Sequence, residues 1–549
     1  MVISVAQLNY HVGNLRANAN KIIHALDDAK RQGVDLLVCA EMALTGYSAK
    51  DLWLSPDFIA ETEATLDELA SKCEGIACLI GAPVINRSGV GKPLFNAAVL
   101  LENGQVSIAA IKGLVPDYDV FDEYRYFQPA DQFSCVEFQG LKIAVTVCED
   151  LWNIGNNPLY RTNPMDVLLQ ESPDLMINLA ASPFASGHAE RRQDVMRQHV
   201  KKAGIPLLYV NQVGANADLI FDGRSMAWSA AGEMLDELPA FKESTGLYHL
   251  MGTELVEAPS YEIGRMPNLV DIALVYQALI LGIRDYFTKS GFNKAVVGLS
   301  GGLDSAVVAA LACEALGSKN VLSVLMPSHY SSDHSVKDAK DLVANVGCES
   351  MIIPIHQPTE GFSKALGQTF KGLLADTTEE NIQARTRAII LMAISNKFGH
   401  VLLNTSNKSE AAVGYGTLYG DMAGALSVIG DLFKTDVYRL ADYINRERDI
   451  IPINTILKPP SAELRPDQKD SDSLPDYSYL DAVLRAYIED NWSVSRIKEA
   501  YGKDEEVDRI IHMVDRAEFK RYQSPPTLRV SKKGFGPGRL MPLVMKKSY

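Results

Sequence analysis

The 549-residue sequence lacks several features that would point to export, to a membrane or to a metal-stapled fold. Its seven cysteines are few for this length, odd in number and nowhere spaced as Cys-x-x-Cys, so neither a disulfide framework nor a zinc ribbon is expected. No apolar run reaches the roughly 18 residues that a membrane helix needs, and the N-terminus lacks the basic-then-apolar pattern of a signal peptide. We therefore expect a soluble cytoplasmic protein with no membrane partner.

Positive charge is also scarce, since 53 Lys and Arg residues face 68 Asp and Glu residues, for a net charge of −15. Non-specific binding to nucleic acid rests on neutralising phosphates with Lys and Arg, so no nucleic-acid partner is expected. Anionic small molecules remain open, because a few cations in a cleft suffice to bind them. The length predicts two domains, because a single core rarely grows this large.

The first half alternates strand-like and helical segments. Asn14 is placed to cap a helical pattern that runs to about Gln32. Short apolar runs typical of strands recur at 2–10, 34–41, 77–84, 96–101, 141–148, 175–180 and 206–212. This pattern predicts a layered α/β domain or a sandwich, and strand alternation alone does not separate the two.

The second half has a more regular pattern. The segment 251–268 has no clear period and contains two prolines, so it is the predicted linker between a domain at 1–250 and one at 269–549. Beyond a long helix at 269–291, strands are expected at 294–299, 321–327, 350–355 and 399–407, with helices at 305–317, 333–346 and 380–397. Strands alternating with helices predict a doubly wound parallel sheet.

The stretch VVGLSGGLDSAVVAAL (296–311) is typical of a phosphate-binding turn, but it lacks the Lys of a Walker A loop. Gly301 and Gly302 allow the backbone to approach an anion closely, and the amides of a helix that starts near Ser305 face the same anion. Ser300 and Ser305 add hydroxyl donors. Asp304 would repel a phosphate unless a cation such as Mg²⁺ lies between them. The alternative is a strand-to-helix turn that binds no ligand.

The S-G-G-L-D-S turn resembles the pyrophosphate loop of the ATP pyrophosphatases, which cleave ATP between its α- and β-phosphates to adenylate an oxygen of the acceptor. The resemblance explains the missing Lys, because the γ-phosphate is not transferred. It also implies which residues contact ATP in this segment: Gly298, Leu299, Ser300, Gly301, Gly302, Leu303, Asp304 and Ser305.

Further motifs resemble the synthetase domain of NAD synthetases: ENIQARTR (380–387), TSNKSE (405–410) and the GYGTLYGD run that ends at 421. A solvated polar helix face is the alternative for the first of these. The resemblance implies ATP contacts from Thr405 and Lys434, and Mg²⁺ ligands at Asp304 and Glu410. It implies deamido-NAD contacts from Asn381, Arg385, Glu410 and Lys520. Shorter, ammonia-using members carry His where this chain has Phe519.

Three residues in the first half stand where strands end, namely Glu41, Lys112 and Cys148. Charged groups beside a buried sheet are costly unless they are paired. A Cys nucleophile needs a base, which Glu41 can supply, and Lys112 can stabilise a developing oxyanion. Each residue also has an ordinary interpretation, since a Cys on a strand is most often inert core.

The segments CAEMALTGY (39–47), KGLVPDYDVFDEYRYF (112–127), VCEDLW (147–152) and NLAASPF (178–184) resemble the Glu, Lys and Cys blocks of the nitrilase superfamily. The resemblance implies a four-layer α-β-β-α sandwich that hydrolyses glutamine through a thioester and releases ammonia. It further implies glutamine contacts from Tyr118, Ser182 and His188.

Taken together, the chain resembles glutamine-dependent NAD synthetases over 2–250 and 265–540. The resemblance implies the last step of NAD biosynthesis: ATP-dependent amidation of deamido-NAD through an adenylate, with release of AMP and pyrophosphate and with ammonia from L-glutamine. It also implies a homo-oligomer. Asparagine synthetases would need Cys after Met1, where this chain has Val2. GMP synthetases use a different glutaminase site, and a nucleotide-binding protein without catalysis would not need this complete residue set.

Overall fold

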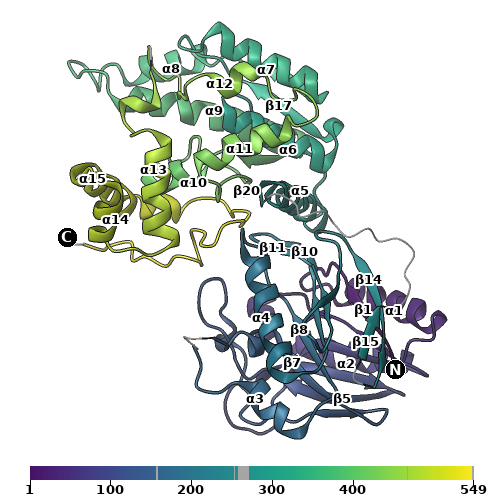
Figure 1. Ribbon diagram of the computed structural model, residues 1–549. Helices are drawn as coiled ribbons and strands as arrows, with labels where there is room; N and C mark the ends of the chain where they lie inside the picture. The colour runs from purple at the N-terminus through teal and green to yellow at the C-terminus, as the bar shows by residue number, and fades with distance from the viewer. Residues whose placement is uncertain (156–158, 253, 258–270, 467, 547–549) are drawn as a thin grey trace. The chain divides into compact units, whose positions relative to one another are not determined.

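The computed structural model describes residues 1–155, 159–252, 254–257, 271–466 and 468–546. The chain divides into two compact units, Met1–Asn268 and Leu269–Tyr549. None of the helices in the described ranges is long and apolar enough to cross a membrane. Each unit is described below by itself (Figure 1).

The first unit contains a seven-stranded and a six-stranded sheet, with the strand orders β15-β14-β1-β2-β3-β4-β5 and β13-β12-β9-β8-β7-β6. The first sheet comprises β1 (Val2–Gln7), β2 (Leu36–Val38), β3 (Ala77–Ile85), β4 (Leu94–Glu102), β5 (Gln105–Ile111), β14 (Ser244–Met251) and β15 (Glu254–Glu257). The second comprises β6 (Val136–Phe138), β7 (Leu141–Val147), β8 (Leu175–Ala180), β9 (Leu207–Asn211), β12 (Met226–Trp228) and β13 (Met234–Glu237). A separate hairpin pairs β10 (Val213–Asn216) with β11 (Leu219–Asp222).

Helices cover the outer faces of these sheets. Helices α1 (Leu15–Arg31) and α2 (Pro56–Lys72) pack on the first sheet, and α3 (Pro164–Leu168) and α4 (His188–Ala203) pack on the second. Asn14 caps α1 as predicted, because its side chain accepts a hydrogen bond from the backbone N–H of Ala17. The unit is therefore the predicted α-β-β-α sandwich.

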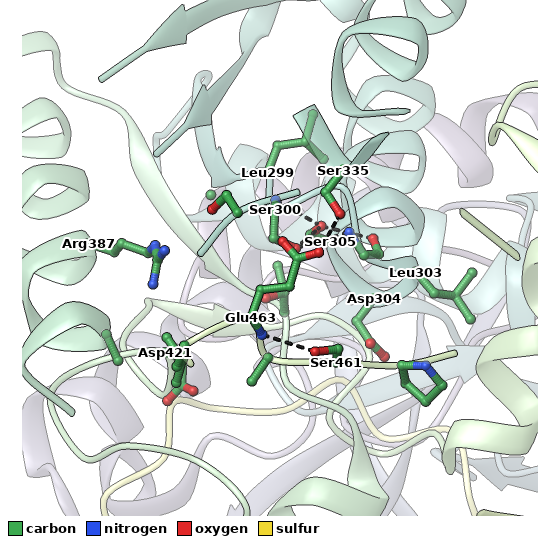
Figure 2. A pocket seen from close by; sticks show the side chains of 18 of the residues that line it. Leu299, Ser300, Leu303, Asp304, Ser305, Ser335, Arg387, Asp421, Ser461 and Glu463 are labelled. Carbon is green, nitrogen blue, oxygen red and sulfur yellow. Dashed lines mark hydrogen bonds between the residues drawn. The ribbon is translucent and has the colours of Figure 1, made fainter. Parts of the chain in front are cut away.

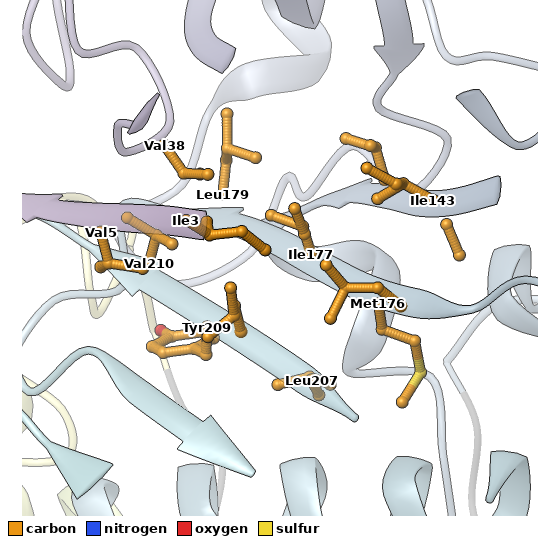
Figure 3. Packing of buried hydrophobic residues seen from close by; sticks show 14 of the residues in the cluster. Ile3, Val5, Val38, Ile143, Met176, Ile177, Leu179, Leu207, Tyr209 and Val210 are labelled. Carbon is orange, nitrogen blue, oxygen red and sulfur yellow. The ribbon is translucent and has the colours of Figure 1, made fainter. Parts of the chain in front are cut away.

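The two sheets share one apolar core (Figure 3). Ile3 and Val5 of β1 point into this core together with Ile177 and Leu179 of β8, and all four are buried. Residues of β1 that alternate with these contact α1 and α2 instead, as Ala6 does. Because central strands such as β8 and β9 are buried on both faces, their sequences are nearly continuous apolar runs rather than alternating ones.

The predicted linker lies partly outside the described residues, namely at 253 and 258–268. Its first part belongs to the first sheet, because Glu254–Glu257 forms β15 and pairs antiparallel with β14. The pattern of 251–257 gave no strand signal, since an edge strand of four residues with one buried side chain shows little periodicity.

The second unit is built on a parallel sheet with the order β18-β17-β16-β19-β20. Its strands are β16 (Ala295–Gly298), β17 (Val321–Leu325), β18 (Glu349–Ile352), β19 (Val401–Asn404) and β20 (Leu426–Ser427). Helices α5 (Asp271–Lys289), α6 (Leu303–Leu316), α7 (Asp333–Val346), α8 (His356–Leu366), α9 (Thr377–Phe398), α10 (Lys408–Val413), α11 (Lys434–Ile444) and α12 (Ile453–Leu457) surround it. This is the predicted doubly wound fold, with α6 beginning at Leu303 rather than near Ser305 and with residues 269–270 of the predicted first helix outside the described ranges.

The C-terminal part adds a small helical subdomain. It contains α13 (Tyr477–Leu484), a π-helical turn (Arg485–Glu489), α14 (Val494–Tyr501), α15 (Asp504–Arg516) and α16 (Glu518–Arg521). Its apolar core packs on α10 through Ala412 and Val413. The subdomain therefore supports the segment that carries Glu410.

Candidate active sites

The three residues singled out in the first half converge on one buried cluster. The Nζ atom of Lys112 donates to Glu41 Oε1 at 2.8 Å, and both side chains are inaccessible to solvent. Lys112 also donates to both carboxylate oxygens of Glu123, at 2.8 and 2.9 Å. A buried ammonium is tolerable only when it is fully paired, and here two carboxylates surround it. Their charge raises the pKa of Lys112 against the effect of burial, so the ammonium keeps its proton.

Glu41 is held in place at both of its carboxylate oxygens. Oε1 also accepts from the side-chain amide of Asn96 at 2.7 Å, and Oε2 accepts from the backbone N–H of Ala181 at 2.9 Å. The backbone beside it is tightly packed, because a Cβ on Gly81 would lie 2.5 Å from the Cα of Glu41. Glycine at 81 thus lets β3 approach the Glu41 segment.

Glu123 is a site residue that the sequence did not single out. It accepts from Tyr47 Oη at 2.8 Å and from Asn96 Nδ2 at 3.0 Å, in addition to Lys112. In the sequence it is one of several acidic residues between 117 and 123, and nothing there marks it as buried. An acidic residue that follows an apolar strand stands out in a sequence, as Glu41 does. Glu123 does not follow one, because it lies in a short 3-10 turn.

Cys148 occupies a strained turn at the end of β7. Its φ is +42°, an unusual conformation for a residue with a side chain. Asp150 fixes this turn by accepting from the backbone N–H groups of Val147, Gly113 and Leu114. Burial and the charge of Glu41 raise the pKa of the Cys148 thiol, and Lys112 opposes this shift. The thiol therefore needs a base, and the neighbouring carboxylate can act as one.

The predicted glutamine contacts lie around the same turn. Tyr118 donates to Glu149 Oε1 at 2.8 Å, directly beside Cys148, and Tyr160 donates to the same oxygen at 3.2 Å. Burial raises the pKa of Glu149 to about 7. Ser182 follows Ala181 and is buried, and its backbone is held by the side chain of Asn211. His188 begins α4 and its ring stacks on Trp152 at 5.1 Å.

The second unit holds a pocket of about 860 Å³ at the carboxyl ends of the parallel strands, as expected for a doubly wound sheet. Of the residues predicted to contact ATP, the following line it: Gly298, Leu299, Ser300, Gly302, Leu303, Asp304, Ser305, Thr405 and Lys434. Gly301 is the exception, because it packs against α7, where a Cβ on it would lie 2.2 Å from the carbonyl oxygen of Ser335. Its φ of +85° also favours glycine.

Asp304 lies in the first turn of α6 and is tied to two distant segments. Its Oδ2 forms an ion pair with Lys434, and its Oδ1 accepts from the side-chain amide of Asn407 at 3.0 Å. The Asp304 side chain keeps 18% of its surface exposed, whereas that of Lys434 keeps 3%. The carboxylate therefore remains accessible from the pocket.

Glu410 lines the same pocket, and its pKa is raised by burial and then by the charge of Asp304. Two carboxylates that repel each other across one cavity fit a divalent cation with oxygen ligands. The described residues contain no cluster of three or more His, Cys, Asp or Glu side chains placed to hold a metal ion. Such a closed cage is not required for Mg²⁺, which is usually bound by one or two carboxylates together with substrate phosphates and water.

Asn381, Arg385 and Lys520 do not line this pocket but contact a single loop beside it. Asn381 Oδ1 accepts from Thr417 Oγ1 at 2.7 Å, and Arg385 Nε donates to the Leu418 carbonyl at 3.2 Å. Lys520 Nζ donates to the carbonyls of Gly414 and Gly416, at 2.8 and 2.7 Å. The structure thus brings these three predicted contacts together around residues 414–418.

Many residues that line the pocket were not among the predicted site residues, and four of them are Arg387, Asp421, Glu463 and Asp470. Figure 2 shows Arg387 and Asp421 on one side of the pocket and Glu463 in the middle of the view. Glu463 accepts from the hydroxyls of Ser332 and Ser335, at 2.7 and 2.8 Å, and Asp470 also lines the cavity. The segment that carries the last two is polar and broken by prolines, so its sequence indicates a loop without indicating what the loop covers.

Family models match both halves of the chain. Residues 2–254 match the carbon-nitrogen hydrolase family and residues 275–524 match the NAD synthase family. The two matches fall in different compact units, and each contains one of the two candidate sites.

Relatives with known names match over the full length. The chain is 45% identical to a glutamine-dependent NAD(+) synthetase of Synechocystis sp., over 98% of both chains, and 40% identical to one of Acinetobacter baylyi, over 99% of this chain and 98% of the relative. A solved glutamine-dependent NAD(+) synthetase of Acinetobacter baumannii, in complex with ADP, is 36% identical and has a TM-score of 0.78 over 99% of this chain and 98% of that one.

Proposed function

The chain belongs to the family of glutamine-dependent NAD(+) synthetases, and we propose how its two units divide the reaction. The first unit releases ammonia from glutamine at Cys148, and the second adenylates the nicotinate carboxylate of deamido-NAD and lets ammonia displace AMP. The observation that supports this division is that each unit holds a candidate site of its own. One contains a nucleophile with a base, and the other contains a phosphate loop with acidic residues.

Glutamine hydrolysis begins with proton transfer from the Cys148 thiol to Glu41, because the raised pKa of the thiol keeps it protonated at rest. The thiolate attacks the side-chain amide carbon of glutamine, and the Lys112 ammonium stabilises the oxyanion that forms. Glu41 then returns the proton to the leaving nitrogen, so that ammonia departs and a thioester remains. Water activated by Glu41 hydrolyses the thioester to glutamate.

Glu149 is suited to bind the α-ammonium group of glutamine. Its carboxylate is buried, lies next to Cys148 and is held by the hydroxyls of Tyr118 and Tyr160. Burial disfavours its charge when no cation is present, and a bound ammonium group would restore that charge. This pairing would select an amino acid over a simple amide.

In the second unit, the loop amides and the hydroxyls of Ser300 and Ser305 would bind the phosphates of ATP, with Lys434 adding positive charge. Asp304 and Glu410 would hold Mg²⁺, which would neutralise the phosphates during cleavage. The nicotinate carboxylate attacks the α-phosphorus, so that the bond to the β-phosphate breaks and pyrophosphate leaves. Ammonia attacks the acyl carbon of the adenylate, giving the amide and AMP.

Deamido-NAD would lie beside the 414–418 loop, where Asn381, Arg385 and Lys520 converge. Arg385 and Lys520 would add positive charge near the dinucleotide phosphates. A homo-oligomer remains a prediction of the family resemblance, and the molar mass measured by light scattering tests it.

Product analysis tests the proposed reaction. The complete mixture of ATP, deamido-NAD, Mg²⁺ and glutamine should yield NAD, AMP, pyrophosphate and glutamate, with AMP and pyrophosphate formed in equal amounts. Ammonium chloride should replace glutamine without formation of glutamate. Formation of ADP and phosphate instead of AMP and pyrophosphate would contradict the adenylate mechanism.

A further inference from the structure

Asn407 links the two carboxylates to which the proposed function assigns Mg²⁺. It precedes α10 in the segment between β19 and that helix, and its side chain is completely buried. Its Nδ2 donates to Asp304 Oδ1 at 3.0 Å, across 103 positions of sequence. A buried amide that binds a partly exposed carboxylate fixes the orientation of that carboxylate.

The other end of the same amide organises the helix that carries Glu410. Asn407 Oδ1 accepts from the backbone N–H of Glu410 at 3.0 Å, and the Asn407 N–H donates to Glu410 Oε2 at 3.4 Å. This reciprocal arrangement is a capping box. One side chain therefore holds Asp304 with its donor and the Glu410 turn with its acceptor.

A neutral donor is the group this position requires. Asp304 and Glu410 repel each other, and Lys434 pairs with only the second oxygen of Asp304. If Asp304 Oδ2 exchanges Lys434 for a metal cation, the hydrogen bond from Asn407 to Oδ1 can persist. The distance between Asp304 and Glu410 is then maintained. A second lysine at 407 would instead lower the negative charge that attracts the cation.

We propose that Asn407 is a positioning residue that sets the spacing of Asp304 and Glu410 for Mg²⁺–nucleotide binding. The inference rests on the proposed function of the second unit and adds to it a residue that contacts neither nucleotide nor metal. It predicts that the donor function of Asn407 matters separately from its capping function.

Three substitutions separate these two functions. Asn407→Ser keeps a favourable capping oxygen but ends one bond short of the Nδ2 that reaches Asp304. Asn407→Asp also caps well but turns an acceptor towards Asp304 in place of the donor. Asn14→Ser in the first unit is the matched control, because Asn14 caps α1 through the backbone N–H of Ala17 in the same way.

Isothermal titration calorimetry with α,β-methylene-ATP, which cannot be cleaved between its α- and β-phosphates, tests the proposal with excess MgCl₂ and with EDTA. Wild type and Asn14→Ser should bind more tightly with Mg²⁺. The affinity of Asn407→Ser for the nucleotide in the presence of Mg²⁺ should be about tenfold lower than that of wild type, a loss typical of one hydrogen bond to a charged group. The affinity of Asn407→Asp should fall at least as much. In EDTA Asn407→Ser should bind within about twofold of wild type, since it changes neither the charge beside the pocket nor the phosphate loop.

Thermal unfolding of the same variants shows whether the helix cap is intact. Asn407→Ser should melt close to wild type, whereas Asn407→Asp buries a second carboxylate beside Asp304 and should melt at a lower temperature. If Asn407→Ser or Asn407→Asp keeps the full Mg²⁺-dependent affinity, the positioning role is overturned and Asn407 is only a cap. If the affinity of Asn407→Ser falls equally with Mg²⁺ and with EDTA, the role is also overturned, because the loss then concerns the pocket as a whole. If wild type shows no Mg²⁺-dependent binding, the proposed function of the second unit fails first, and this inference fails with it.

Discussion

The two sites of this chain handle charge in opposite ways. In the first unit, Lys112 pairs with both Glu41 and Glu123 at 2.8–2.9 Å, and all three side chains are almost completely buried. In the second, Asp304 faces a pocket of about 860 Å³ and keeps part of its surface exposed. The first site has its charges fixed before substrate arrives, whereas the second leaves one carboxylate able to exchange its partner.

This difference matches the two proposed reactions. Amide hydrolysis uses a nucleophile and a base that belong to the protein, so their geometry can be set by packing and hydrogen bonds. Adenylation brings in phosphates and a cation with several charges, which a pocket with every charge already paired would exclude. A buried cluster with paired charges and an open pocket with a partly exposed carboxylate are therefore two solutions to the same electrostatic problem. The substitutions below test the contrast.

Cys148→Ala should give the largest effect. Glutamine-dependent NAD formation should fall at least about a thousandfold, because the nucleophile is lost, while NAD formation from ammonium chloride should stay near wild type. The measurement is NAD produced from each nitrogen source. Cys135→Ala is the matched control, since Cys135 lies away from the cluster and contacts the carbonyl of Leu168. Equal loss of both activities in a folded Cys148→Ala protein would show that the two sites do not divide the reaction as proposed.

Asp304→Asn should impair the second site and leave the first site working, the reverse of Cys148→Ala. It removes the charge proposed to hold Mg²⁺, so NAD formation should fall about a hundredfold or more with both nitrogen sources. Glutamine hydrolysis measured as glutamate release should persist. Asp341→Asn is the control, because Asp341 pairs with Lys337 on the surface. Normal use of ammonium by Asp304→Asn would remove Asp304 from the proposed site.

Much of this contrast was predictable from the sequence, because strand ends are visible in it. Glu41, Lys112 and Cys148 each follow an apolar run, so the sequence locates three strand ends. Only the fold shows that β2, β5 and β7, which belong to two different sheets, bring these ends together. The Gly-rich turn before α6 was visible for the same reason. Both features depend on local patterns of residues.

Other parts of both sites were not predictable, because they depend on contacts between distant segments. Glu123 is 11 residues from Lys112 in the sequence, among other acidic residues, and only the fold shows that it is buried. Asn407 is part of a quoted motif, but its bond to Asp304 spans 103 positions. Arg387 is the last residue of the quoted motif ENIQARTR, and only the structure shows that it lines the pocket.

The buried and open sites should also differ in what they contribute to stability. Lys112→Met leaves two carboxylates buried without their cation, so we expect the first unit to lose about 3–5 kcal/mol of unfolding free energy. Lys434→Met also removes a buried cation, but Asp304 keeps its bond from Asn407 and 18% of its surface exposed, so the second unit should lose less than the first. Hydrogen–deuterium exchange resolved by peptide measures each unit separately. Equal losses would contradict the distinction drawn between the sites.

The smallest predicted effect concerns pH at Glu149. Burial raises its pKa in the folded chain from 4.5 to about 7, so folding favours its protonated form. That stabilisation is complete below about pH 4.5 and is lost as pH rises through 7. Binding of an α-ammonium group favours the ionised form of Glu149 instead, since the ammonium group pairs with the carboxylate.

Consequently kcat/KM for glutamine should increase as pH rises through about 7, by up to about tenfold per pH unit below the pKa of Glu149. NAD formation from ammonia should not follow this pH profile. Glu149→Gln should flatten the step and raise KM for glutamine more than it lowers kcat. Tyr160→Phe is the milder companion variant, because it removes the weaker of the two hydroxyl donors and keeps the carboxylate. It should shift the step upwards without abolishing it, since a hydroxyl donor lowers the pKa of Glu149. An unchanged step in Glu149→Gln would assign the titration to another group and remove Glu149 from glutamine binding.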